Sequence, residues 1–246
     1  MNLGLDGKLC VVTGATRGIG AATVRMLKQE GAEVLAVARN DADLELDVTA
    51  ADAGDRVLAA CPQRPWALIN AAGDAKARPL DELTDADWQA HWELHVMGPM
   101  RLMRALAPAM ADSDGGRIVN VSSSSGKRPS RRLDASYSVT KAALLSLSRL
   151  FADTWSANGV LVNAVAPGPI EGESWTAAGG LADEIAGRTQ STRGDVLEAT
   201  GSGLPIGRMG TDDEAAAVIV FLCSQLASNV TGAAWSVDGG SVPIIL

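Results

Sequence analysis

RIVNVSSSSGKRPSRRLDASYSVTK, residues 117–141, is the stretch that decides the fold. It opens with an alternating apolar run, Ile118, Val119 and Val121, which predicts a buried strand ending at four consecutive serines. A basic, turn-rich loop follows, and a helix is expected to begin near Tyr137. The stretch therefore predicts a strand, a loop and a helix, with the serines at the carboxyl end of the strand.

Tyr137 and Lys141 are the residues of this stretch that point to chemistry. They are four apart, so they share one face of the expected helix, and Tyr137 is the only tyrosine in the chain. A phenol titrates at about pH 10, and a neighbouring ammonium lowers that pKa by roughly 1–3 units. A serine at the strand end would hydrogen-bond the same substrate oxygen. The pattern indicates proton transfer on a carbonyl/alcohol couple; the alternative is a surface tyrosine beside a lysine.

Working outward, the N-terminal region predicts a strand, a glycine turn, a helix and a second strand. The strand covers residues 8–13, the turn GATRGIG covers 14–20, the helix ends at Gly31, and the second strand covers 33–39. This βαβ order predicts parallel strands with a right-handed crossover. The glycines of the turn would let the backbone approach a pyrophosphate at the helix N-terminus.

The end of the second strand bears on the choice of cofactor. An acidic residue there would bind the ribose 2′-hydroxyl of NAD, but the strand ends in Arg39, and Arg17 lies inside the glycine turn. Two guanidinium groups suit a 2′-phosphate, which favours NADP(H) over NAD(H). The alternative is that both are solvated surface arginines.

The next elements follow closely. Only residues 40–43 separate the second strand from a short strand at 44–48, too few for a crossover helix. Asp47 would either reach the adenine or cap a helix that starts around residues 49–52. Another strand at 65–70 ends in Asn70 and a run of small residues, which lets the backbone pass close to a ligand.

The rest of the chain alternates helices and strands. We predict a helix at 81–112 with Thr84 as its N-cap, apolar residues including Trp92 on its buried side, and a kink at Gly98-Pro99. His91 and His95 lie on this helix without an indicated third ligand, so no metal site is predicted. The remaining elements are a helix at 138–158, a strand at 160–167, a long irregular insert at 168–203 interpreted as a lid, a helix at 211–227 capped by Thr211 and Glu214, and a strand at 233–237.

Composition limits the class of protein. The 246 residues carry a net charge of −8, which argues against nucleic acid and anionic membranes as partners. Three cysteines, an odd number, predict buried free thiols in a reducing compartment. The chain shows no signal peptide and no apolar run of transmembrane length, so we expect one cytoplasmic domain spanning 1–246.

Six motifs occur in order: TGATRGIG (13–20), NAAG (70–73), the serine-ended strand, YSVTK (137–141), PGPI (167–170) and VDGG (237–240). With these motifs the chain resembles the short-chain dehydrogenase/reductase family, and in particular its 3-oxoacyl-[acyl-carrier-protein]-reductase-like members. The resemblance implies an α/β Rossmann-type fold, a doubly wound seven-stranded parallel sheet with helices on both faces. It also implies NAD(P)(H)-dependent oxidoreduction and a homodimer or homotetramer.

The resemblance implies roles for individual residues. Tyr137 would be the general acid/base, Lys141 would lower its pKa and hold the nicotinamide ribose, and a serine would orient the substrate oxygen. Cofactor contacts would come from Gly14, Arg17, Gly18, Ile19, Gly20, Arg39, Asp47, Val48, Asn70, Ala71, Gly73, Tyr137, Lys141, Pro167, Gly168 and Ile170.

The chain departs from the family pattern at three places. His95 stands where an asparagine normally helps to hold a proton-relay water, and we include His95 among the candidate catalytic residues. The serine is Ser123 by the strand text and Ser124 by the commonest spacing; we favour Ser123, because a loop absorbs an extra residue more easily than a buried strand. Gly172 replaces a threonine that often binds the nicotinamide carboxamide, a role left to Ser174 or to backbone.

The leading hypothesis is an NADP(H)-dependent enzyme that interconverts a ketone and a secondary alcohol, such as a 3-oxoacyl thioester or a small cyclic ketone. The alternatives are an NAD-dependent dehydrogenase of a cyclic diol and a catalytically weak NADP-binding regulatory protein. Arg128, Arg131 and Arg132 precede Tyr137 and are either a solvated loop or a docking site for a carboxylate or phosphopantetheine.

Overall fold

The computed structural model describes residues 2–243, and within them seven strands form one parallel sheet. Its order is β3-β2-β1-β4-β5-β6-β7, which reverses direction between β1 and β4, as in a doubly wound fold. The strands are β1 (Leu9–Thr13), β2 (Glu33–Ala38), β3 (Leu44–Glu45), β4 (Pro65–Asn70), β5 (Gly116–Val121), β6 (Val160–Pro167) and β7 (Ala234–Val237). The predicted fold class is confirmed.

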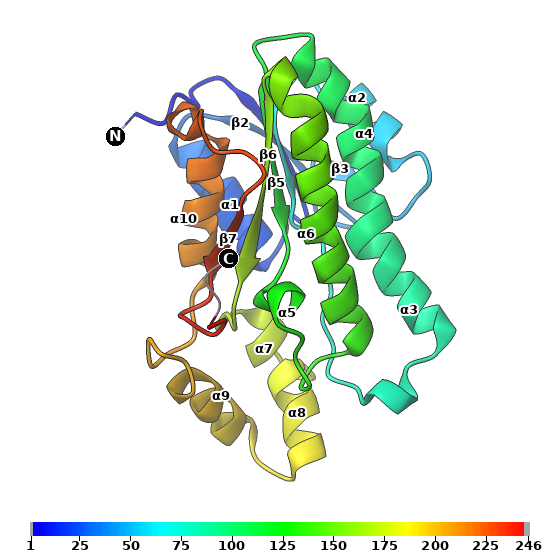
Figure 1. Ribbon diagram of the computed structural model, residues 1–246, viewed down its shortest axis with the longest axis vertical. Coiled ribbons are helices and arrows are strands. Elements are labelled where there is room, and N and C mark those ends of the chain that lie inside the picture. The colour runs from blue at the N-terminus through cyan, green and yellow to red at the C-terminus, as the bar shows by residue number, and fades with distance from the viewer. Residues whose placement is uncertain (1, 244–246) are drawn as a thin grey trace.

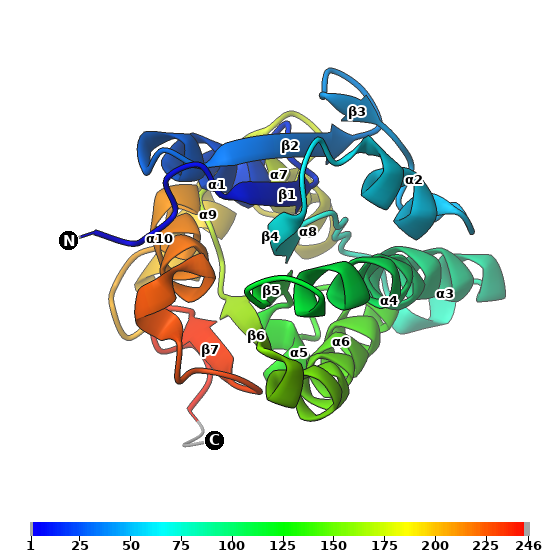
Figure 2. The ribbon, with the colours of Figure 1, turned by 90° about the horizontal axis from the view of Figure 1, so that it is seen from above.

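Helices cover both faces of the sheet (Figures 1 and 2). They are α1 (Gly18–Gln29), α2 (Ala53–Ala60), α3 (Asp85–Trp92), α4 (Gly98–Ala111), α5 (Ser124–Lys127), α6 (Ala135–Trp155), α7 (Glu173–Thr176), α8 (Leu181–Thr189), α9 (Arg193–Ser202) and α10 (Asp212–Cys223). Helices α1 and α10 pack on one face, and α2, α4 and α6 pack on the other. Helices α7–α9 form a separate lobe beyond the sheet (Figure 1).

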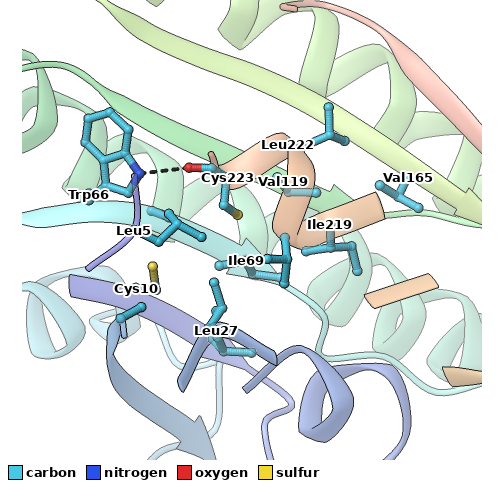
Figure 3. Close-up of a cluster of buried hydrophobic side chains, with 14 of the residues drawn as sticks. Leu5, Cys10, Leu27, Trp66, Ile69, Val119, Val165, Ile219, Leu222 and Cys223 are labelled. Atoms are coloured by element: carbon cyan, nitrogen blue, oxygen red, sulfur yellow. Dashed lines mark hydrogen bonds between the residues drawn. The ribbon is translucent and has the colours of Figure 1, made fainter. Parts of the chain in front are cut away.

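Two buried clusters hold these layers together. Under α1 and α10, Leu27, Ile219 and Leu222 pack on side chains of the central strands (Figure 3). The indole Nε1 of Trp66 donates to the carbonyl of Cys223 at 2.8 Å, which satisfies the polar end of an otherwise apolar ring. Because strands of a parallel sheet are buried on both faces, β1 and β4 are almost wholly apolar in sequence, while β5 also buries the polar residues Arg117 and Asn120.

Several predicted boundaries are corrected. The helix predicted at 81–112 is a short 3-10 turn followed by α3, a π-helical turn at Glu93–Met97, and α4. The irregularity thus lies just before Gly98. Trp92, which was predicted on the buried side, is 41% exposed. The strand predicted at 44–48 shortens to two residues, and the helix after it begins at Ala53.

The insert at 168–203 is also more regular than predicted, because three helices, α7, α8 and α9, occupy most of it. Their apolar residues, among them Trp175, Leu181 and Ile185, form a third buried cluster. Thr192 and Asp195 form a capping box at the start of α9. The predicted box of Thr211 and Glu214 is present on α10.

No helix among the described residues is both long and apolar enough to span a bilayer. Within residues 2–243, no three potential metal-ligating side chains of His, Cys, Asp or Glu gather at one point. Cys10 and Cys223 are buried free thiols as predicted, whereas Cys61 is half-buried.

Candidate active site

A cleft of about 1810 Å³ runs along the carboxyl ends of the strands. Its walls come from the turn after β1, the ends of β2, β4, β5 and β6, the start of α6, and the lobe of α7–α9. Ligands of open α/β sheets bind in this position, where the strand order reverses. Nearly all of the predicted site residues line this cleft, although the sequence separates them by more than 150 positions.

At two positions the glycine turn after β1 leaves no room for a side chain. Gly14 has φ +65°, and a Cβ there would lie 2.8 Å from the backbone of Ala72. A Cβ on Gly20 would lie 2.1 Å from the carbonyl oxygen of Gly14. These two positions therefore require glycine, and they open the N-terminus of α1 to a phosphate group. Gly14, Arg17, Gly18, Ile19 and Gly20 all line the cleft, so the turn fits a dinucleotide.

The far end of the cleft is basic. Arg17 and Arg39 both line it, both are exposed, and neither forms an ion pair within residues 2–243. Asp47 and Val48 form the adjoining wall. The carboxylate of Asp47 accepts from the backbone N–H of Thr49 at 2.9 Å, and this bond lowers the pKa of Asp47.

Asn70 does not face the cleft, in contrast to its predicted cofactor contact. It is buried between β4 and β5, where its Nδ2 donates to Oδ1 of Asn120 at 2.7 Å. Asn120 in turn donates to the hydroxyl of Ser148 on α6 at 2.8 Å. The amide therefore ties the sheet to α6, and it is Ala71 and Gly73, directly after the strand, that line the cleft.

Ser123 and Tyr137 meet at the centre of the cleft. Ser123 is buried at the end of β5, where its Oγ accepts from the backbone N–H of Ser125 at 3.1 Å and caps α5. Burial raises the pKa of Tyr137, a hydrogen bond with Ser123 lowers it, and the charge of Asp74 raises it. Ser123, rather than Ser124, is thus the serine that contacts Tyr137. Overall the pKa of Tyr137 is raised, so our prediction that it is lowered is wrong.

Lys141 is buried one turn after Tyr137. Its Nζ donates to the carbonyl of Val121 at 2.8 Å and lies 5.7 Å from the centre of the Tyr137 ring. The ammonium is therefore occupied by the sheet rather than by the phenol, which explains why it does not lower the pKa of Tyr137. Burial lowers the pKa of Lys141 itself to about 8.

Two stacked imidazoles form the wall behind Tyr137. The ring centres of His91 and His95 are 5.1 Å apart, and both rings stand edge-on to Tyr137. A Cβ on Gly73 would lie 3.5 Å from Lys141 Nζ and 3.6 Å from His95 Nε2, so both groups lie close to Gly73. Lys141 lines the cleft, whereas the predicted site residue His95 is buried behind it. Burial and the charge of Lys141 hold the pKa of His95 far below its usual range. His95 is therefore neutral.

The loop after β6 completes the cleft. Pro167, Gly168 and Ile170 lie at or just after the carboxyl end of β6, and all three line the cleft. Gly172, which replaces the threonine, and Ser174, one candidate for its contact, also line the cleft at the start of α7.

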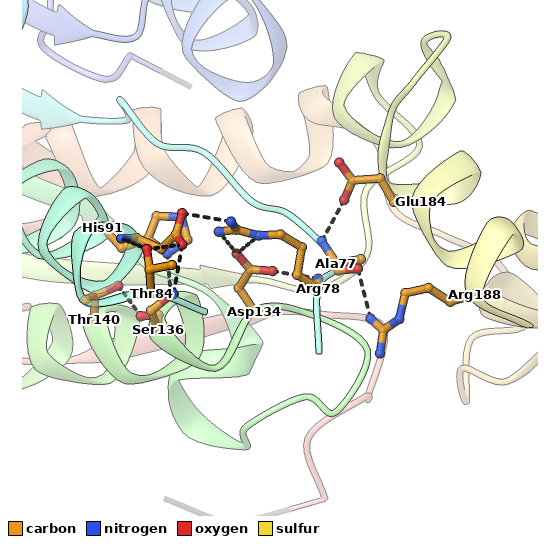
Figure 4. A network of polar contacts seen from close by, with 10 residues as sticks. Ala77, Arg78, Thr84, His91, Asp134, Ser136, Thr140, Glu184 and Arg188 are labelled. Atoms are coloured by element: carbon orange, nitrogen blue, oxygen red, sulfur yellow. Dashed lines mark hydrogen bonds and ion pairs between the residues drawn. The ribbon is translucent and has the colours of Figure 1, made fainter. Parts of the chain in front are cut away.

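A polar network that the sequence does not reveal fixes the start of α6 (Figure 4). The side chain of Asp134 is fully buried and accepts from the backbone N–H and the guanidinium of Arg78. The neighbouring Ala77 N–H donates to Glu184 at 2.6 Å, and its carbonyl accepts from Arg188 at 2.9 Å. Segment 77–78 thus joins α8 of the α7–α9 lobe to the helix that carries Tyr137.

Comparisons with known proteins agree with this geometry. Residues 14–241 match the family model described as enoyl-(acyl carrier protein) reductase. The chain is 33% identical to sorbitol dehydrogenase of Cereibacter sphaeroides over 256 residues, covering 96% of this chain and 98% of the relative. The chain belongs to the short-chain dehydrogenase/reductase family, whose members are NAD(P)-dependent oxidoreductases of alcohols and carbonyl compounds.

Two solved structures resemble it throughout. L-sorbose reductase from Gluconobacter frateurii, complexed with NADPH and L-sorbose, superimposes with a TM-score of 0.90 at 30% identity, covering 100% of both chains. A putative NAD(P)-dependent gluconate 5-dehydrogenase from Beutenbergia cavernae with bound NADP has a TM-score of 0.86 at 28% identity, covering 99% of this chain and 100% of that one.

Proposed function

We propose that this protein is an NADP(H)-dependent oxidoreductase that interconverts a ketone and a secondary alcohol on a small polyhydroxylated substrate. The observation that carries the proposal is that Ser123, Tyr137 and Lys141 line one cleft. The same cleft is lined by a glycine turn with two positions that exclude a side chain. NADP(H), when bound, supplies or accepts the hydride. The residues of this chain hold the substrate oxygen and move its proton.

Tyr137 is the proton carrier in this proposal. In the reductive direction its hydroxyl donates a proton to the oxygen of the ketone, and in the oxidative direction the phenolate removes it. Since the pKa of Tyr137 is raised, the phenol is protonated at neutral pH, which suits it to act as the acid. Ser123 hydrogen-bonds the same oxygen and fixes its position.

Arg17 and Arg39 support NADP(H) as the cofactor. Both are exposed at the end of the cleft where the adenosine 2′-phosphate of a bound NADP(H) would lie. Asp47 and Val48 bound the adenine side, and Pro167, Gly168 and Ile170 bound the nicotinamide side. The NADPH and NADP named in the two related structures favour the same cofactor.

The substrate class rests on the lining and on the relatives. Several serine and threonine residues line the cleft: Ser123, Ser130, Ser174, Thr200 and Ser241. Three of the relatives are named for sorbitol, L-sorbose and gluconate, which share one six-carbon polyhydroxylated skeleton, and another is named for a 3-oxoacyl-[acyl-carrier-protein] substrate. A polyhydroxylated ketone fits this surface better than the long acyl chain of a 3-oxoacyl thioester.

The test is NADPH oxidation with a panel of ketoses, keto acids and cyclic ketones, for the wild type and Tyr137→Phe. We expect turnover in the wild type, a loss of about 10²–10⁴-fold in kcat for Tyr137→Phe, and unchanged NADPH affinity. A variant that keeps normal turnover would refute the role of Tyr137. Turnover with NADH and a cyclic diol alone would instead establish the diol dehydrogenase alternative.

We also propose a homodimer or homotetramer. Large apolar side chains lie exposed on α6, where Val139 is 48% and Leu150 is 62% exposed, and Trp235 on the edge strand β7 is 36% exposed. Such side chains on a helix face and a sheet edge are suited to contact with a second copy. Light scattering of the purified protein measures the state directly, and a monomer at micromolar concentration would contradict it.

A further inference from the structure

Three arginines stand at the substrate end of the cleft. Arg128, Arg131 and Arg132 all line it, and all three are exposed. Their loop joins α5, which begins directly after Ser123, to α6, which carries Tyr137. The loop therefore joins the two elements that carry Ser123 and Tyr137, and its arginines line the same cleft as these two side chains.

The backbone of the loop is held in place. The N–H of Arg128 donates to the carbonyl of Ser124 at 2.9 Å, and that of Arg132 donates to the hydroxyl of Ser130 at 3.2 Å. Leu133 packs against the apolar cluster of the lid, and Asp134 is bound by Arg78. The loop thus presents three guanidinium groups from a fixed backbone, so little further ordering is needed to bind a ligand.

The three guanidinium groups have no internal counter-charge. Within residues 2–243 none of them forms an ion pair, whereas six other arginines do: Arg25, Arg78, Arg101, Arg149, Arg193 and Arg208. No carboxylate of the described residues lies within ion-pair distance of these three guanidinium groups. In a protein with a net charge of −8, three unpaired arginines on one cleft wall are a local reversal of charge.

We propose that Arg128, Arg131 and Arg132 form an oxyanion subsite that binds a carboxylate or phosphate carried by the ketone substrate. The guanidinium group has a planar fork that matches both oxyanions, and a wall of arginines favours them over a neutral hydroxyl. This inference rests on the proposed function and narrows its substrate class from polyhydroxylated ketones to anionic ones.

The experiment uses ketones that differ only in charge. L-sorbose and 5-keto-D-gluconate share the same skeleton and the same ketone carbon, but one ends in CH₂OH and the other in a carboxylate. D-fructose and D-fructose 6-phosphate form the corresponding pair for phosphate. For each ketone we measure kcat/KM with NADPH at low and high ionic strength. The proteins compared are the wild type, the single variants Arg128→Gln, Arg131→Gln and Arg132→Gln, and the triple variant. Arg56→Gln is the control, because Arg56 lies outside the cleft.

We expect kcat/KM for one anionic ketone to exceed that for its neutral partner by about 10-fold or more, since one charge-assisted hydrogen bond has that effect. Added salt lowers this ratio, as does each single variant, and the triple variant brings it close to one. The control Arg56→Gln leaves the ratio unchanged. Which pair shows the preference identifies the oxyanion.

Two outcomes would overturn the inference, and they are distinguishable. Equal kcat/KM for the charged and neutral ketones, or a ratio unaffected by the arginine variants, would overturn the subsite while the proposed function stands. Absence of NADPH oxidation with every ketone tested would overturn the proposed function and the subsite with it. NADPH titration of each variant verifies that the cofactor half of the cleft remains folded.

Discussion

His95 Nδ1 lies 2.9 Å from the hydroxyl of Thr140, one turn from the reacting end of α6. The backbone N–H of Asp74 donates to the other nitrogen, Nε2, at 3.3 Å, so the proton of the neutral ring is on Nδ1. The hydroxyl of Thr140 in turn donates a hydrogen bond to the carbonyl of Ser136 at 2.8 Å. The imidazole therefore has a defined tautomer, with Nδ1 donating to Thr140 and Nε2 accepting from Asp74.

A neutral buried His95 makes the protein sensitive to acid. Its pKa is far lower in the folded state than the usual 6.5, so the unfolded chain binds more protons as the pH falls below that value. We expect the unfolding free energy of the wild type to fall by about 2 kcal/mol more than that of His95→Gln between pH 7 and pH 5. Denaturant titrations at the two pH values measure this; parallel losses in both proteins would show that His95 is not the cause.

Lys141 makes stability depend on pH in the same direction, but in the alkaline range. Its folded-state pKa is about 8 against the ordinary 10.5, so between these values the unfolded chain binds more protons and the protein gains stability as the pH rises. We expect the wild type to gain about 2 kcal/mol relative to Lys141→Met between pH 7 and pH 9.5. Contributions of the buried thiols are common to both proteins and cancel in the difference. A constant difference in denaturant midpoint across this range would contradict the assignment.

Arg78 protects a buried charge. The Asp134 side chain is fully buried, and Arg78 is the guanidinium that pairs with it. Arg78→Ala leaves that carboxylate without its counter-charge, so we expect a loss of about 2–3 kcal/mol in unfolding free energy and a lower Tm. Arg149→Ala is the matched control, because it removes an exposed pair with Asp153 and should hardly change the Tm. Similar Tm values for the two variants would disprove the structural role of Arg78.

Arg39 is predicted to select the cofactor. Arg39→Gln should weaken NADPH binding by about 10-fold or more and leave NADH binding unchanged, because only NADPH carries the 2′-phosphate. Fluorescence titration with both cofactors measures this, and Arg56→Gln is again the control. Equal losses for NADPH and NADH would mean that Arg39 supports the fold of the cleft rather than the 2′-phosphate.

Residues that follow strand ends were predictable from the sequence. The glycine turn, Gly73, Ser123 and Pro167 each come directly after an apolar run, and parallel strands bring their carboxyl ends to one edge. Tyr137 and Lys141 were predictable because helical spacing alone places them on one face. In these cases local order in the sequence determines position in the site.

Contacts between distant segments were not predictable. Asp134 lies directly before α6, and it pairs with Arg78, 56 residues earlier in the chain. Asn70 belongs to a motif at a strand end, but its amide turns into the sheet toward Asn120. The pKa of Tyr137 depends on burial and on what Lys141 binds, and neither is visible in the spacing. The Thr192/Asp195 pattern is the one available signal for helix in the lid, since it marks the start of α9.

The peptide unit of Ala77 bonds the lid on both of its polar sides, to Glu184 and to Arg188, while the next residue holds Asp134. Any displacement of α8 that preserves these bonds must carry Ala77 with it and pull on the first turn of α6. The size of a substrate bound beneath the α7–α9 lobe therefore affects the position of the Tyr137 phenol. Discrimination among substrates of different bulk should accordingly be seen in kcat as well as in KM.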